Sequence, residues 1–240
     1  MNVSQNKLIA CRTVIEEMKP LVPPNTECIT LDSGLHVNPE KLRAALREII
    51  NEITADTENI ILGYGLCSMG VIGLSASRSN LVVPRLDDCI AIFLGSRKAY
   101  ENELDKEPGT YFLSKGWVEA GITLLDDLKR MEKEYGKDRA DRIMKRMLKN
   151  YRRLAYVDMG NGDQDQYRKF SRRAAEKLNL DYQQIRGTKD FMEKILKGPW
   201  DDDFIVAPPG YTISMDDFKI FQGKEKSLRG LQKESVVRNE

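Results

Sequence analysis

The stretch NIILGYGLCSMGVIGL, residues 59–74, joins an apolar strand pattern to a glycine-rich loop. A short apolar run that ends in glycines is typical of a buried strand whose carboxyl end leads into a closely packed loop. On either side, similar apolar runs alternate with amphipathic helical patterns, which favours βαβ units. We therefore predict an α/β protein built on a Rossmann-like parallel sheet that is covered by helices.

Working outward from this stretch predicts the remaining elements. We expect strands at residues 7–11, 27–31, 59–64, 81–84, 154–158, 181–185 and 204–207, and helices at 12–19, 39–53, 89–102, 166–178 and 191–196. A basic segment, residues 122–156, predicts two helices with a turn at 136–138. This order suggests an N-terminal lobe (1–120), a helical connector with a second α/β lobe (121–222) and a polar tail (223–240), with one continuous sheet as the alternative.

Composition excludes several classes of protein. The 240 residues include 38 Lys and Arg against 37 Asp and Glu, a net charge of +1, so there is no basic excess to neutralise nucleic-acid phosphates. No apolar run approaches the roughly 20 residues of a membrane span, and the N-terminus lacks the pattern of a signal peptide. We expect a cytoplasmic protein without nucleic-acid or membrane partners. The four cysteines are then buried residues, reactive thiols or metal ligands.

Three cysteines and the single histidine follow strand ends. Cys11 ends the first predicted strand, His36 follows the second, Cys67 the third and Cys89 the fourth. Ligands of parallel sheets bind at the carboxyl edge, so these four residues are predicted to face one site. They suit zinc, and an iron–sulfur cluster if one ligand is replaced. Individually, each residue is better explained without a metal: Cys11 and Cys67 by packing at strand ends, Cys89 as a buried helix residue and His36 as a loop residue or cap. Cys28 is expected in the core.

Charged residues near this edge are candidates for binding substrate. Arg12 and Arg85 are expected to hold an anionic group of a small-molecule substrate. Arg97 is explained equally well by pairing with nearby acids. Asp88 is the candidate catalytic residue, and both it and Asp32 are placed to orient the imidazole or accept a proton.

Three further segments have two interpretations each. The glycines of residues 63–74 would suit a phosphate, but they match no complete phosphate-binding motif and more plausibly allow close backbone approach. In residues 108–121, Tyr111 and Trp117 either line a pocket or close the interface between lobes, which is the better-supported interpretation. Asp201, Asp202 and Asp203 would attract Mg²⁺ or simply form a helix-to-strand turn.

Several ordered motifs resemble the family called domain of unknown function 1638. They are ACRT (10–13), LDSGLH (31–36), LGYGLCSMGVIGL (62–74), PRLDDCIAIFLGSRKAY (84–100), PGTYFLSKGW (108–117) and WDDDFIVAPPG (200–210). The resemblance places Cys11, His36, Cys67 and Cys89 in signature motifs and leaves Cys28 outside them. It also implies an association with corrinoid-dependent methyltransferase systems of anaerobic bacteria and archaea.

Three functions follow as hypotheses. The first is a zinc enzyme that transfers a methyl or related group and involves a thiol or a corrinoid, with a corrinoid protein or a methyltransferase as partner. The second is a non-catalytic metal-binding accessory or regulatory protein of a methyltransferase system. The third is an iron–sulfur redox protein.

Overall fold

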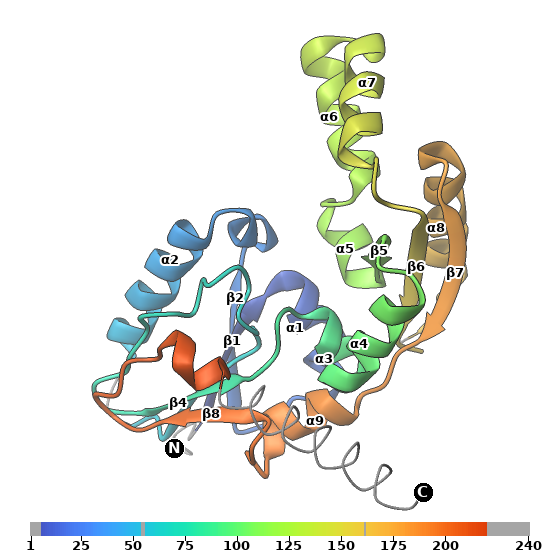
Figure 1. Cartoon of the computed structure of the whole chain (residues 1–240). Helices are drawn as coiled ribbons and strands as arrows, with labels where there is room; N and C mark the ends of the chain where they lie inside the picture. Colours follow the sequence, from blue (N-terminus) through green and yellow to red (C-terminus); the bar gives the residue numbers. More distant parts are fainter. Residues whose placement is uncertain (1–5, 54–55, 161, 220–240) are drawn as a thin grey trace, which may run out of the picture.

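A computed structural model describes residues 6–53, 56–160 and 162–219, and it contains two separate sheets (Figure 1). The first sheet has the order β2-β1-β3-β4-β8, and the second has the order β5-β6-β7. All pairs are parallel except the antiparallel pair of β4 and β8. The α/β class and the predominance of parallel strands are confirmed, and the alternative of one continuous sheet is wrong.

The first sheet follows the predicted strands closely. Its strands are β1 (Asn6–Cys11), β2 (Thr26–Leu31), β3 (Asn59–Leu62), β4 (Asn80–Pro84) and β8 (Phe204–Ala207). The helical elements between them are α1 (Arg12–Met18), η1 (Lys19–Leu21), η2 (Ser33–Val37), α2 (Pro39–Glu52), α3 (Ile90–Leu94), α4 (Arg97–Lys106) and α9 (Asp190–Lys197). Figure 1 shows α2 on the outer side of this sheet and α1 on the side that faces the second sheet.

The second sheet carries the helical hairpin. Its elements are β5 (Thr110–Leu113), α5 (Lys115–Ala120), α6 (Leu124–Tyr135), α7 (Lys137–Met147), β6 (Arg153–Asp158), α8 (Asp165–Leu178) and β7 (Asp181–Arg186). The helices α6 and α7 form an antiparallel pair that projects from the body (Figure 1). The two sheets do not follow the expected lobe boundary at residue 120. β5 precedes this boundary but joins the second sheet, and β8 follows it but joins the first sheet.

A hydrophobic core runs between the sheets. Phe112 of β5 and Ala155 of β6 belong to the same buried cluster as the first sheet, whereas their neighbours Leu113 and Leu154 belong to a second cluster with α6, α7 and α8. Successive strand residues point to opposite faces, so the second sheet packs on both sides. The two parts therefore share a packed interface.

One expectation about the elements changes, and another falls outside the described residues. The helix expected at 89–102 is two helices, because Gly95 adopts φ +87° and the side chain of Ser96 caps α4 through the N–H of Ala99. The tail expected at 223–240 lies outside the described residues. No helix of the described part is both long and apolar enough to cross a membrane.

Candidate functional site

The strand order changes direction at β1. This strand pairs with β2 on one side and with β3 on the other, so the loops that follow β1 and β3 diverge from adjacent strand ends. In open parallel sheets such a point is where ligands bind. Cys11 ends β1, and the glycine-rich loop with Cys67 follows β3.

Glycines let the loop after β3 approach its neighbours. A Cβ atom on Gly63 would lie 2.6 Å from the Cβ of Ala10, and one on Gly65 would lie 2.5 Å from the carbonyl oxygen of Leu86. Close contact leads to two backbone hydrogen bonds between the loops: Leu66 N–H donates to Leu86 O at 2.7 Å, and Cys67 N–H donates to Asp87 O at 3.1 Å. These bonds hold Cys67 beside the segment that carries Asp88 and Cys89.

The backbone at Cys67 has an unusual conformation. Cys67, Ser68 and Met69 adopt φ values of +43°, +54° and +71°, in the left-handed region that non-glycine residues seldom occupy. The turn closes through Gly70 N–H, which donates to Cys67 O at 3.0 Å, and the carbonyl of Met69 accepts from Arg43 Nη2 at 2.8 Å. Backbone strain of this kind concentrates at binding and catalytic sites.

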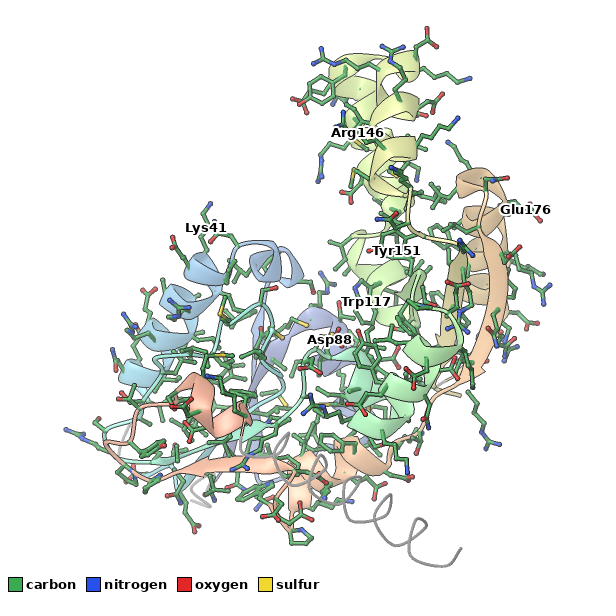
Figure 2. The ribbon with its side chains drawn as sticks, viewed as in Figure 1. Lys41, Asp88, Trp117, Arg146, Tyr151 and Glu176 are labelled. Carbon is green, nitrogen blue, oxygen red and sulfur yellow. The ribbon has the colours of Figure 1, made fainter. Side chains whose placement is uncertain are left out.

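These loops enclose a cavity of about 220 Å³. It is lined by Cys11, Thr13, Tyr64, Cys67, Ser68, Asp87, Asp88, Cys89 and Trp117. Figure 2 shows Asp88 and Trp117 close together between the two halves of the molecule. Three of the four predicted ligands, and the predicted Asp88, therefore line one cavity.

Burial keeps the three thiols protonated. Desolvation raises the pKa of Cys67 to about 12, and the nearby Cys11 and Asp88 add to this rise. Desolvation also raises the pKa of Cys89 far above its ordinary value. Burial raises the pKa of Cys11, although the N–H groups of Val14 and Thr13 at the start of α1 partly oppose it. The thiols influence one another, so a cation between them would stabilise their thiolates.

Asp88 is held firmly at the edge of the cavity. Its Oδ1 accepts from Ile90 N–H at 2.8 Å, and its Oδ2 accepts from Tyr100 Oη at 2.9 Å. Burial raises the pKa of the Asp88 carboxyl, against the effect of these two hydrogen bonds. The carboxyl group is thus fixed in position and accepts a proton more readily than an exposed aspartate does.

Tyr64 is a cavity residue that the sequence did not suggest, as are Thr13 and Ser68. Its side chain is only 2% exposed, and its hydroxyl has no hydrogen-bond partner among the described residues. Burial raises the pKa of Tyr64 well above its ordinary value, and Cys11, Cys67 and Cys89 raise it further. Its place between two glycines, directly after β3, is the sequence signal that could have indicated this position.

The arginines expected at the site lie elsewhere. Arg12 is exposed, and neither it nor Arg85 lines the cavity. Burial raises the pKa of the Asp217 carboxyl, but hydrogen bonds from Ser214 and Tyr211, with a smaller contribution from the charge of Arg85, lower it overall. Arg97 pairs with Asp87 at 3.4 Å and with Glu101 at 3.2 Å, as the alternative interpretation holds. A substrate-binding role for Arg12 and Arg85 stays a prediction.

The position of His36 is described only in part. Its backbone belongs to η2, whose Ser33 lies 3.1 Å from Thr13 Oγ1 beside Cys11, while the His36 side chain lies outside the described part. Asp32 accepts from Gly34 N–H at 2.7 Å and so caps η2. Among the described side chains, no group of three His, Cys, Asp or Glu residues is arranged to hold a metal. The four-ligand set therefore stays a prediction.

The prediction for Cys28 is wrong. Its side chain is exposed, because β2 is an edge strand whose residues at 27, 28 and 30 are open to solvent. Desolvation, with a smaller contribution from Glu27, raises the pKa of this thiol.

The other two ambiguous segments are resolved by their contacts. Trp117 lines the cavity and also packs edge-on against Phe93, with 5.3 Å between ring centroids, whereas Tyr111 packs against the second core cluster. Lys194 pairs with Asp201 at 2.8 Å and with Asp203 at 2.5 Å, which favours the turn over a Mg²⁺ site.

The fold and the cavity define an α/β protein with a thiol-lined pocket where the strand order of a parallel sheet changes direction. The family model described as Protein of unknown function (DUF1638) matches residues 30–196, well over half of the chain, and the chain belongs to this family. His36, Cys67 and Cys89 lie within the matched region, and Cys11 precedes it. The comparisons with curated proteins and with solved structures gave no match.

Proposed function

We propose that the protein is a zinc-binding enzyme that transfers a methyl group to a thiol. The observation that carries this proposal is the convergence of Cys11, Cys67 and Cys89 on one cavity at the carboxyl edge of the sheet. Thiolate sulfur is a preferred zinc ligand, and we propose His36 as the fourth ligand, with one of the four giving up its place when a substrate thiol binds.

The cavity suits a bound dication in two respects. The thiols lie near enough to raise one another's pKa, so their thiolates repel one another unless a cation lies between them. In addition, the carboxyl group of Asp88 borders the same space. Zinc, when bound, lowers the pKa of a coordinated thiol and so supplies a nucleophile at neutral pH.

The open space beside the thiols favours an enzyme over a closed structural site. A structural zinc is enclosed by four protein ligands, whereas a catalytic site keeps room for substrate. The cavity of about 220 Å³ has such room. We expect the substrate thiol to lose its proton to Asp88 or to solvent, after which its sulfur bonds to the methyl carbon. The bond from that carbon to the donor then breaks, and the donor keeps the electron pair.

A methylated corrinoid is our proposed donor. This choice is supported by the family resemblance alone, and cobalt would retain the electron pair of the broken bond. A partner protein that carries the corrinoid belongs to the same proposal.

Metal content tests the proposal directly. Protein purified without oxygen should contain about one zinc per chain and no broad visible absorption band. Cys67→Ser should lose most of the zinc. Cys28→Ser should keep it, because Cys28 is exposed and does not line the cavity. Protein that contains no metal, and takes up none on dialysis against zinc, would falsify the proposal. A broad visible absorption band together with stoichiometric iron would show that the site holds an iron–sulfur cluster and not zinc.

A further inference from the structure

The hydroxyl of Tyr64 is buried and has no hydrogen-bond partner in the described part of the chain. The side chain is 2% exposed and borders the cavity, yet no described residue accepts from or donates to its oxygen. Leaving a buried polar group unsatisfied costs about 1–3 kcal/mol, so such groups generally meet a ligand or a water molecule. Cys11, Cys67 and Cys89 line the same cavity as Tyr64.

The hydroxyl can act only as a neutral group. A tyrosine hydroxyl ordinarily has a pKa of about 10, well above neutral pH, and the Tyr64 hydroxyl is buried. It therefore keeps its proton and donates a hydrogen bond. A ligand next to it needs an acceptor atom at that point.

The charges around the cavity disfavour an additional anionic group. Two lining residues, Asp87 and Asp88, are acidic, and no lysine or arginine appears among the described residues that line the space. The nearby Arg97 is engaged by Asp87 and Glu101. A carboxylate or phosphate on the ligand would thus meet like charges, and a zinc ion held by three thiolates has no net positive charge to offset them.

The size of the cavity limits the ligand further. A volume of about 220 Å³ holds about seven water molecules at roughly 30 Å³ each. Part of this room is taken by the metal, so only a compact ligand fits.

We infer that the cavity binds a small uncharged thiol, whose sulfur accepts a hydrogen bond from Tyr64. The inference deepens the proposed function and rests on it for the metal that would hold the sulfur. Tyr64 would then orient the nucleophile that receives the methyl group, while the acidic residues exclude thiols that carry a carboxylate.

Calorimetric titration with two matched probes tests this inference. The probes are 2-mercaptoethanol, which is uncharged, and mercaptoacetate, which replaces its hydroxymethyl group by a carboxylate; a phosphine keeps the protein reduced. Zinc-loaded protein should bind 2-mercaptoethanol at least about tenfold more tightly than mercaptoacetate. Tyr64→Phe should weaken 2-mercaptoethanol binding about tenfold with unchanged zinc content. Tyr111→Phe, in the second core, should leave the binding unchanged.

Three results would overturn the inference: equal binding of both probes, unchanged affinity of Tyr64→Phe, or no binding by zinc-loaded protein. Thermal unfolding of the metal-free proteins gives a separate check. Removal of an unpartnered hydroxyl should not lower the melting temperature, and a clear drop for Tyr64→Phe would show a protein partner and contradict the inference.

The zinc assay separates this inference from the proposed function. Protein without zinc that still binds 2-mercaptoethanol through Tyr64 would remove the proposed function and leave the thiol site. If zinc-loaded protein binds neither probe, the inferred thiol site is contradicted and zinc binding is not. Protein that takes up no zinc and binds neither probe would remove both.

Discussion

Gly65 sets the separation of the two loops that carry Cys67 and Cys89. A methyl group at this position would lie 2.5 Å from the backbone oxygen of Leu86, which cannot move without disturbing the hydrogen bonds between the loops. We expect Gly65→Ala to lower the free energy of unfolding by about 2 kcal/mol and to lower zinc content, because Cys67 moves away from Cys89.

Gly73 provides a control in the same loop. A Cβ atom there meets nothing within 4 Å, but the residue has φ +81°, so Gly73→Ala should cost about 1 kcal/mol of backbone strain and leave zinc content unchanged. Urea unfolding and metal analysis measure both variants. Unchanged zinc content in Gly65→Ala would show that the loop separation does not govern the site.

For individual residues, the sequence predicts which cysteines lie together but does not predict which other side chains surround them. Cys11, Cys67 and Cys89 could be grouped because carboxyl ends of parallel strands meet at one edge. Cys28 could not be placed, because an apolar pattern does not show which strand lies at the edge of a sheet. Tyr64 was missed because a buried hydroxyl without a partner becomes visible only when every neighbour is known.

The N-terminus of α6 shows how one element is defined locally. Thr123 Oγ1 accepts from Asp126 N–H at 3.3 Å, and Asp126 Oδ2 accepts in return from Thr123 N–H at 3.1 Å, which forms a capping box. Burial raises the pKa of Asp126, but its hydrogen bonds with Thr123 and the charge of Lys129 prevail and lower it.

The lowered pKa predicts a dependence on pH. Because the folded-state pKa of Asp126 lies below that of the unfolded chain, its stabilisation is present at neutral pH and is lost as the pH falls through the folded-state value. Asp126→Ala should lower the free energy of unfolding by about 1 kcal/mol at pH 7, and this difference should shrink between about pH 5 and pH 2.

Urea unfolding at several pH values measures this difference. Asp141→Ala, at an exposed position on α7, serves as the control and should stay within about 0.5 kcal/mol of the parent protein at neutral pH. A difference between Asp126→Ala and the parent that persists undiminished at pH 2 would contradict the assignment.

Most elements could be predicted because their signals are local. Strand and helix ranges agree within a few residues where apolar periodicity is strong, and the turn at Gly136 lies between α6 and α7 as expected. The break between α3 and α4 was missed although Gly95 and Ser96 are a helix terminator and an N-cap. The apolar residues on both sides concealed it.

On the scale of the whole molecule, Arg153 connects the second sheet to α4. Its Nη1 lies 3.1 Å from Glu103 Oε2, its Nη2 donates to the Glu103 carbonyl at 2.9 Å, and its Nε donates to Thr110 Oγ1 at 2.8 Å. Both charged side chains are nearly inaccessible to solvent. Removing Arg153 leaves the carboxylate of Glu103 largely buried, with the more exposed Lys106 at 2.5 Å as its remaining ion-pair partner among the described residues.

We expect Arg153→Met to lower the free energy of unfolding by about 3 kcal/mol, as measured in urea. Arg152→Met changes the exposed neighbour and should cost less than about 0.5 kcal/mol. Combining Arg153→Met with Glu103→Met should recover part of the loss, because no buried charge of this pair remains. Equal losses of stability in Arg152→Met and Arg153→Met would show that the Arg153–Glu103 ion pair does not stabilise the fold.

The pairing of distant strands could not be predicted from the sequence. Apolar periodicity identifies β8 as a strand but contains no information about its partner, and it does not identify β5. In the structure, β5 joins the second sheet. β8 pairs antiparallel with β4, which lies more than one hundred residues earlier in the chain. Which sheet β5 and β8 join depends on which sheet edges and apolar faces remain open after the helices pack.

The wide sequence separation of Cys11, Cys67 and Cys89 determines the order of assembly. These residues come together only after β1, β3 and β4 have paired, so the unfolded chain contains no preformed chelating unit. In zinc fingers the metal drives folding of a short segment. Here the polypeptide would fold first and acquire its ion last, so a cell could hold a folded, unloaded pool of this protein that waits for delivery of metal.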